Sequence, residues 1–240
     1  METSDTAHQR RLRRDARIAG LLYLLVVGGG LLGLAWAPGQ LGPMSNPAAV
    51  ASTLMANAGA FRLGIAGLLV MEVAFLLLPL ALYRIFRDVD RAAATLMAAL
   101  AMVSVPIMLV GVAHRWDALA ALQAGALPGD SEAANAAWLS LRAYASAQWI
   151  ASLFWGLWLF PFGWLVLRSG RIPRLLGALL LLGGLGYVAD VSADLVGLAT
   201  DSAALRALRL CAAAGEIGSA LWLSIFGARA GRSGKSGESS

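Results

Sequence analysis

Six apolar runs, separated by polar or charged stretches, organise this sequence. Each run is about 20 residues long, and a helix of that length crosses the roughly 30 Å hydrocarbon core of a bilayer at about 1.5 Å per residue. The pattern therefore predicts an all-α fold, a polytopic transmembrane helical bundle with six spans. The predicted spans cover residues 18–37, 62–83, 92–113, 146–167, 174–196 and 206–227.

The composition supports a membrane protein and excludes an ordinary soluble domain. Hydrophobic residues make up 59% of the 240 residues, charged residues make up 14%, and the mean hydropathy is +0.70. Soluble domains contain about 25% charged residues, so this chain has too few charges for a water-covered surface. We expect the lipid bilayer to surround most of the protein.

The two ends of the chain are predicted to lie outside the bundle. Residues 1–17 form a basic segment, and residues 229–240 are rich in Gly and Ser, which is typical of disordered chain. Residues 18–228 form one transmembrane domain without a visible repeat. The Ala-Trp-Ala stretch at 35–37 resembles a signal-peptide cleavage site, but the apolar run before it exceeds the roughly 7–15 residues of a signal peptide. We therefore expect the first span to be retained.

The positive residues are distributed unequally between the two sides of the predicted bundle. Of the 19 Lys and Arg residues, fourteen lie at the amino end, in the links after spans two and four, and in the tail. Positively charged connections favour the cytoplasm, so we expect both termini to be cytoplasmic, in the inner membrane of a bacterium. The net charge of +5 reflects this topology rather than nucleic-acid binding. The five residues on the other side are Arg62, Arg115, Arg142, Arg206 and Arg209.

The outer connection at residues 38–61 contains a predicted surface helix. Asn46 followed by Pro47 is a typical helix start, because Asn caps the first turn and Pro tolerates its first position. We expect the helix to lie on the outer membrane surface. The apolar residues predicted to share one face are Val50, Leu54, Ala58 and Phe61.

Four acidic residues fall inside the predicted spans: Glu72, Asp190, Asp194 and Glu216. A carboxylate at mid-membrane costs about 2.5–3.5 kcal/mol, so these groups must be neutral, paired or hydrated. Counting about 1.5 Å per residue from the cytoplasmic helix ends places Glu72 and Glu216 about 16 Å deep, near the midplane. Asp190 and Asp194 lie nearer the outer surface, and their spacing of four residues puts them on one helix face.

The polar groups of the spans therefore gather in the outer half of the membrane, which predicts a polar cavity that opens outward. We expect Glu72, Asp190 and Glu216 to line it, with Arg62 near its rim. The other candidate lining residues are Asp194, Gln148 and Trp155. In the structural alternative, the carboxylates only join helices through hydrogen bonds, which are worth about 0.6 kcal/mol each in membranes.

No enzyme signature is present in the sequence. It contains no HExxH, GxSxG or phosphate-binding loop motif. A single cysteine and two histidines, His8 and His114, do not provide a multi-cysteine or His-based metal cluster. We expect no cofactor and no metal, and an intramembrane enzyme is the least favoured class.

Four stretches resemble a family of bacterial integral membrane proteins: ARIAGLLYLL at 16–25, FRLGIAGLL at 61–69, RSGRIPRLLGALLLLGGLGYVAD at 168–190 and GEIGSALWLSIFG at 215–227. The family is catalogued as domain of unknown function 4386, and the resemblance covers residues 16–228. It implies six helices in a bacterial cytoplasmic membrane and implies no activity. The residues within the matching motifs that it draws attention to are Arg62, Asp190, Glu216 and Trp222, whose role there is either structural or functional.

Two functions fit these observations. In the first, the protein binds or translocates a small solute or protons through the outward-facing cavity. In the alternative, it is a membrane scaffold or partner subunit whose buried carboxylates hold helices together. The sequence does not identify the ligand or the oligomeric state.

Overall fold

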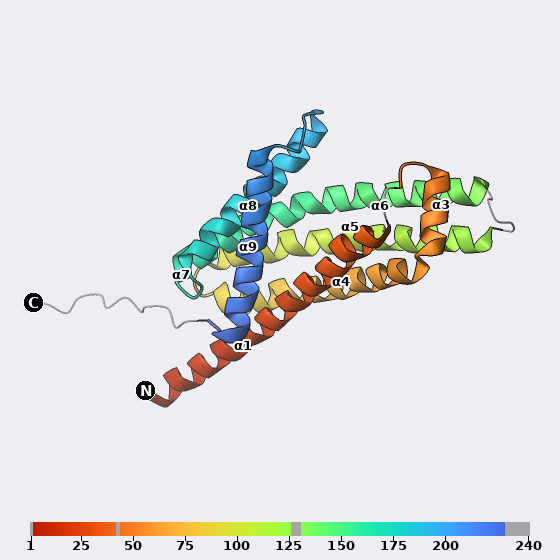
Figure 1. Ribbon diagram of the computed structural model, residues 1–240. Helices are drawn as coiled ribbons and strands as arrows, with labels where there is room; N and C mark the ends of the chain where they lie inside the picture. The colour runs from red at the N-terminus through yellow and green to blue at the C-terminus, as the bar shows by residue number, and fades with distance from the viewer. Residues whose placement is uncertain (1, 42–43, 126–130, 229–240) are drawn as a thin grey trace, which may run out of the picture.

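The computed structural model describes residues 2–41, 44–125 and 131–228, with side chains from Gln9 onward, and these ranges are almost entirely helical (Figure 1). The tail at 229–240, for which we predict disorder, lies outside the described residues. In chain order the helices are α1 (Glu2–Gly30), a π-helical segment (Leu31–Trp36), α2 (Ala37–Leu41), α3 (Pro47–Ala56), α4 (Ala58–Phe86), α5 (Arg91–Ala124), α6 (Ser131–Leu157), α7 (Leu159–Ser169), α8 (Arg174–Leu195) and α9 (Ala203–Ile225).

The prediction of six spans in a helical membrane bundle is confirmed. Among the described residues, six helical stretches are long and apolar enough to cross a membrane. They are Gln9–Leu41, Ala58–Phe86, Arg91–Ala124, Ser131–Ser169, Arg174–Leu195 and Ala203–Ile225.

The helices around the second outer connection are longer than the predicted spans. The sequence predicts a connection over residues 114–145, with Asp130 or Ser131 able to cap a lead-in to span four. Asp130 lies outside the described residues. The structure has α6 beginning at Ser131, in agreement with that lead-in, whereas α5 continues to Ala124, past the predicted end of its span. Both extensions are rich in Ala and Leu, which have the highest helix propensities. A hydropathy pattern reports the part of a helix that suits lipid, so it does not detect a helix that continues past that part.

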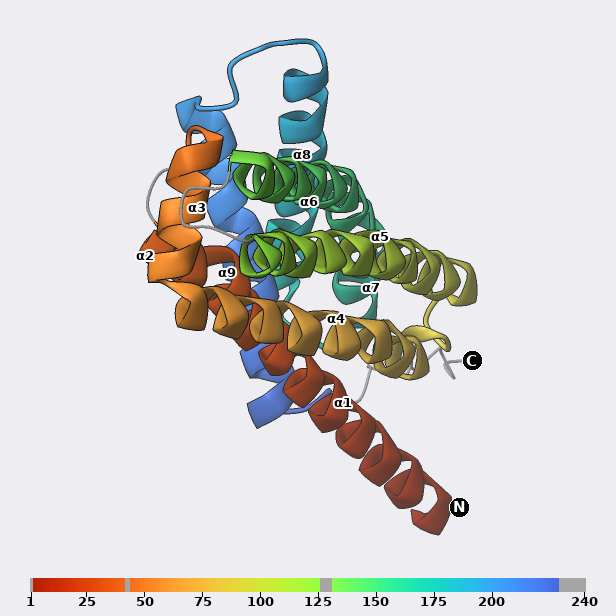
Figure 2. The same cartoon turned by 90° about the vertical axis from the view of Figure 1, so that its right-hand side faces the viewer.

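The bundle has two ends, and the helices separate toward one of them. The first turns of α1 and the end of α9 lie together, with Gly227 beside Arg13, at what we name the terminal end. From there the α8–α9 pair and the layer of α4, α5 and α6 point in different directions, as Figures 1 and 2 show. The end of α5, the start of α6 and the connection between α8 and α9 lie away from the terminal end (Figure 1).

The short helix α3 has its predicted start, and the four apolar residues predicted to share a face pack into one hydrophobic cluster. The Asn46 side chain accepts a hydrogen bond of 2.9 Å from the backbone N–H of Ala49, with Pro47 in the first helical position. The helix α3 ends at Ala56, and α4 begins at Ala58. The apolar residues expected on one helix face therefore belong to two helices. Val50 and Leu54 are buried, and α3 packs mainly against α6.

Small residues set the contacts between the spans. A methyl group added at Gly29 of α1 would lie 2.5 Å from the backbone oxygen of Gly67 in α4, and one at Gly163 would lie 2.8 Å from that of Gly177. Gly183 of α8 is equally close to Ala212 of α9. In lipid, where apolar side chains have no preference for each other over acyl chains, such close backbone packing drives helix association.

The two short links at the terminal end are joined by charged side chains. Arg171, which is buried, donates to both carboxylate oxygens of Asp88 at 2.8 and 2.6 Å and also to the backbone oxygen of Ile85. Asp90 caps α5 by accepting a hydrogen bond of 3.0 Å from the backbone N–H of Ala93. These contacts fix the link between α4 and α5 against the link between α7 and α8.

The cap at Asp90 makes stability depend on pH. The hydrogen bond from Ala93 holds the pKa of Asp90 below its ordinary value. A carboxylate whose pKa is lower in the folded state adds stability above its unfolded pKa, and this stability is lost as the pH falls through the folded pKa. We predict that, below about pH 4, the thermal unfolding midpoint of the purified protein falls less in Asp90→Asn than in the unchanged protein.

The asparagine variant is the appropriate comparison because its amide oxygen preserves the cap without titrating. Identical pH profiles for the two proteins would show that the Asp90 cap contributes nothing to acid stability.

Candidate functional site

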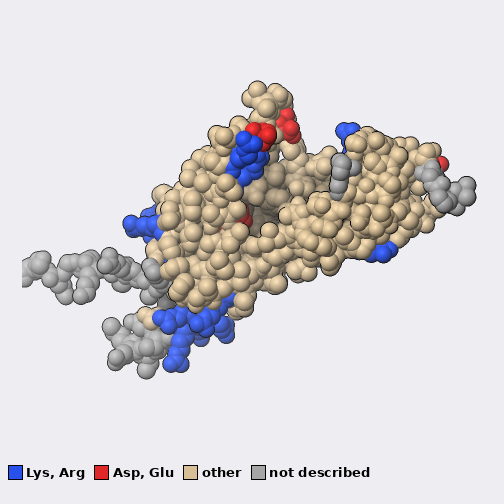
Figure 3. All heavy atoms as spheres, in the orientation of Figure 1, with Lys and Arg blue, Asp and Glu red and all other residues tan. Residues whose placement is uncertain are grey.

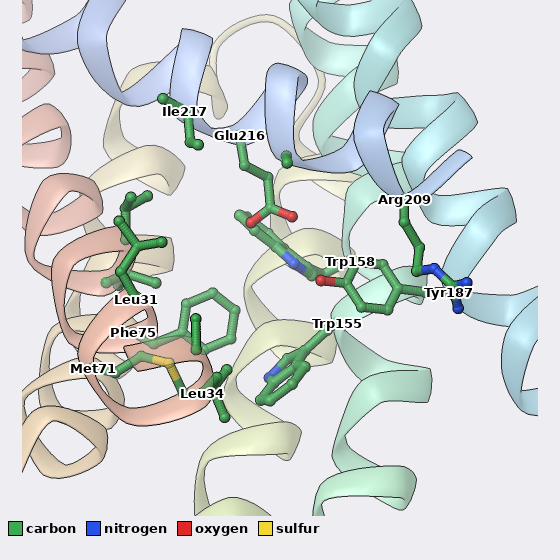
Figure 4. Close-up of a pocket in the computed structure, with 15 residues that line it drawn as sticks. Leu31, Leu34, Met71, Phe75, Trp155, Trp158, Tyr187, Arg209, Glu216 and Ile217 are labelled. Carbon is green, nitrogen blue, oxygen red and sulfur yellow. The ribbon is translucent and has the colours of Figure 1, made fainter. Parts of the chain in front are cut away.

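A cavity of about 300 Å³ lies where α1 and α9 separate. Figure 4 shows its wall formed by side chains from α1, the π-helical segment, α4, α6, α8 and α9. In the space-filling view the molecule is hollowed between the α8–α9 pair and the neighbouring helices, with acidic atoms visible within the hollow (Figure 3). Most of the lining is apolar and includes Leu31, Leu34, Met71, Phe75, Trp155 and Ile217.

Glu216 is the acidic residue of the lining. It lies on α9, half-buried, and its carboxylate points toward the rings of Trp158 and Tyr187 (Figure 4). The hydroxyl of Tyr23 on α1 donates a hydrogen bond of 3.2 Å to it. None of the described Lys or Arg side chains forms an ion pair with Glu216. The cavity therefore contains a carboxylate with one neutral hydrogen-bond partner and no counter-ion.

Aromatic rings close the cavity toward the terminal end. Trp158 is 1% exposed and stacks on Phe162, with ring centroids 5.3 Å apart and planes 8° from parallel. Tyr23 packs against both rings, at 6.1 and 6.4 Å. Phe75 meets Trp158 edge-on at 5.3 Å. These four side chains form what we name the aromatic floor, and packed interiors of this kind leave no continuous path for water.

An ion pair lies at the rim of the cavity. Arg209 of α9, which lines the cavity, donates to both carboxylate oxygens of Asp190 of α8 at 3.0 and 2.8 Å. A second nitrogen of the same guanidinium donates to the backbone oxygen of Thr200 at 3.2 Å. Asp190 therefore holds α8 against α9, and it neutralises Arg209, which is the one cation that the described residues place in the cavity lining.

The structure brings only some of the predicted site residues together. Glu216 and Trp155 line the cavity, and Asp190 reaches its rim through Arg209. The others do not belong to the lining: Arg62 and Asp194 are exposed, Gln148 is half-buried and Glu72 is fully buried.

Helix rotation explains why Glu72 lies apart from Glu216. Met71 and Phe75 of α4 line the cavity, and consecutive residues of a helix are about 100° apart around its axis. Glu72 therefore lies on the neighbouring face of α4, where its side chain is fully buried. Neither of its carboxylate oxygens has a hydrogen-bond partner among the described residues.

Arg115 is a second buried charge, and the sequence prediction placed it only on the outer side. Its side chain is 3% exposed, and its guanidinium lies over the rings of Phe61 and Tyr144 at 4.7 and 5.0 Å. It also donates a hydrogen bond of 3.1 Å to the backbone oxygen of Gly33.

Arg115 thereby binds the π-helical segment without lining the cavity, and that segment forms part of the cavity wall through Leu31 and Leu34. Such π-helical turns occur frequently at functional sites. The sequence contained a signal for the burial of Arg115. Val112, Ala118 and Leu119 are apolar and lie on the same helix face as Arg115.

The chain also matches a known family. The sequence profile described as "Domain of unknown function (DUF4386)" matches residues 18–227. The chain belongs to the DUF4386 family. This confirms the resemblance seen in the sequence motifs, and the family description assigns no activity to any residue.

One relative of this DUF4386 protein is an uncharacterized protein of Archaeoglobus fulgidus. The two are 33% identical over 87 residues, which cover 36% of this chain and 50% of the relative. The match thus spans about half the length of the relative. No solved structure matches the chain.

The unpartnered carboxylate of Glu72 generates a prediction about stability. A buried polar group without a partner destabilises the folded state, and an apolar side chain of similar length removes that cost. We predict that Glu72→Met raises the free energy of unfolding by about 1–3 kcal/mol, measured by denaturation of this DUF4386 protein in detergent.

The matched variant is Glu216→Met, which leaves the buried Tyr23 hydroxyl without its acceptor and is expected to lower stability. If Glu72→Met instead loses more than about 1 kcal/mol, the Glu72 carboxylate has a partner that stabilises the bundle.

Proposed function

We propose that this multi-pass membrane protein binds a small amphipathic molecule in the cavity at Glu216. The observation that carries the proposal is a cavity of about 300 Å³ with apolar walls and a carboxylate that lacks a counter-ion. Ligand sites in proteins are typically concave and mostly apolar, with volumes of about 300–1,000 Å³ and a few polar groups that orient the ligand. A bundle built only for packing would fill this space with side chains.

The ligand reaches the cavity from the end opposite to the termini. Gly20 of α1 packs directly against Ser224 of α9 near the terminal end, and the aromatic floor closes the cavity on that side. Toward the opposite end the lining becomes exposed, since Leu31 is 58% exposed and both Arg209 and Ala213 are exposed. The entrance between α1 and α9 thus faces both the water at that end and the acyl chains beside it.

In the proposed orientation the cavity opens away from the cytoplasm of a bacterium. The basic residues support this orientation, because they gather around the terminal end (Figure 3) and positively charged segments favour the cytoplasmic side. Translocation would additionally require the aromatic floor to open. Ligand binding needs no such movement, so binding is the function that this geometry supports.

A scaffold is the second candidate function, and specific contacts favour it. The hydrogen bond between Tyr23 and Glu216 joins α1 to α9, and the ion pair between Asp190 and Arg209 joins α8 to α9. Both contacts hold helices together, as a purely structural role requires. A test of the proposal must therefore distinguish a cavity that accepts a molecule from one that only separates helices.

Filling the cavity with a side chain provides that test. Ala213 lines the cavity, whereas its neighbour Ala214 is exposed and does not. A molecule that binds the folded state raises its stability by mass action. We predict that neopentylbenzene, an uncharged apolar probe, raises the thermal unfolding midpoint of the unchanged protein and of Ala214→Trp in detergent, but not that of Ala213→Trp.

Two outcomes contradict the proposal. Equal responses in Ala213→Trp and Ala214→Trp would place the bound probe elsewhere on the protein. No response in any of the three proteins would favour the scaffold.

A further inference from the structure

We propose that the ligand of this cavity is a hydrophobic organic cation, which is an amine or quaternary ammonium compound carrying aromatic or short alkyl groups. This inference rests on the proposed function and specifies the chemical class of its ligand. It follows from the charge balance of the lining, from the rings around Glu216 and from the depth of the site.

The charge balance of the cavity favours a cationic ligand. Two side chains of the lining can carry a charge, Glu216 and Arg209, and the described residues add no other Lys or Arg to it. A bound cation favours the ionised form of Glu216, and the charge balance of the cavity is then negative. Both carboxylate oxygens of Asp190 and the backbone oxygen of Thr200 accept hydrogen bonds from Arg209, so its charge is compensated and its donors are occupied. Glu216 has only the neutral hydroxyl of Tyr23 as a partner. An anionic ligand would therefore meet an uncompensated carboxylate and no free cation.

Aromatic rings surround the position where a cation would pair with Glu216. Trp155, Trp158 and Tyr187 line the same part of the cavity, and the Glu216 carboxylate points toward the latter two (Figure 4). A cation within about 6 Å of such a ring is attracted by the negative face of its π system, most strongly by Trp, and cages of this kind recognise quaternary ammonium groups. The cationic group therefore has both a carboxylate and ring faces as partners.

The remaining lining matches the apolar part of such a ligand. Leu31, Met71 and Ile217 provide aliphatic contacts. Aromatic and alkyl groups form no hydrogen bonds, so they need no further polar side chain in the lining. The site lies near the middle of its span, where the low dielectric constant strengthens the attraction between opposite charges. Compounds that are both cationic and apolar also accumulate at the boundary between water and acyl chains, where the entrance lies.

A series of probes with one shape and different charges tests the inference. Benzyltrimethylammonium and neopentylbenzene differ only in a positively charged nitrogen in place of a carbon atom, and phenylmethanesulfonate supplies a negative charge. We expect the purified protein to bind benzyltrimethylammonium at least about tenfold more tightly than neopentylbenzene, which corresponds to about 1.4 kcal/mol, and to bind the sulfonate least. The affinities are measured by titration while following the unfolding midpoint.

Two carboxylate variants test whether Glu216 causes the preference for benzyltrimethylammonium over neopentylbenzene. In Glu216→Gln we expect the ratio of the two affinities to fall several-fold, because the countercharge is gone and only the ring faces still favour the cation. Asp194→Asn removes an exposed carboxylate of α8 that does not line the cavity, and it should keep the full preference. Should Glu216→Gln fail to fold, Trp155→Leu removes a ring of the lining while keeping the carboxylate, and the preference should decrease several-fold.

The failures of the two proposals are distinguishable. Equal affinities for benzyltrimethylammonium and neopentylbenzene in the unchanged protein would overturn the cation class while leaving a ligand-binding cavity. An undiminished preference in Glu216→Gln would also overturn it, because the Glu216 carboxylate would then make no contribution to cation binding. If none of the three probes binds, the proposed function itself fails.

Discussion

The structure depends on close backbone contact at small residues, because lipid gives apolar helices no other strong reason to associate. Gly29 of α1 meets Gly67 of α4, and Gly183 of α8 meets Ala212 of α9, and these two helix pairs are among the most extensively packed in the bundle. Between α1 and α9 the comparable contact is confined to Gly20, near the terminal end. The cavity opens where that contact ends. Its position is thus a consequence of which face of α1 carries the glycines.

Glu72 and Glu216 have a similar predicted depth but different surroundings. This difference distinguishes a carboxylate packed inside the bundle from one that faces the cavity. Glu72 is fully buried and has no hydrogen-bond partner among the described residues, whereas Glu216 is half-buried and faces open space. Asp190 belongs to a third type, since its pairing with Arg209 satisfies both partners and fixes α8 to α9. Glu216 is therefore the carboxylate of these three that is positioned to bind a molecule from outside the protein.

The sequence was sufficient to predict the six spans, because the length of each apolar run and the rise per residue determine them. The sequence was insufficient to predict how each helix is rotated about its axis. The rotation of α4 decides that Met71 and not Glu72 faces the cavity. Rotation follows from tertiary contacts such as those of Gly67, and one sequence does not identify the partner of each contact. The Asp190 carboxylate was expected to find an arginine or water, but only the fold shows that Arg209 pairs with it.

The central claim is that water-filled space reaches Glu216 from the side opposite to the termini and ends at the aromatic floor. Its most direct test is the reaction of single cysteines, in a Cys211→Ser background, with a membrane-impermeant methanethiosulfonate reagent added to intact cells. We predict that Ala213→Cys, which lies in the cavity lining, reacts from outside, whereas Ser219→Cys, which is fully buried, does not. Reaction of Ala213→Cys only in inverted vesicles, or equal rates at both positions, would contradict the account.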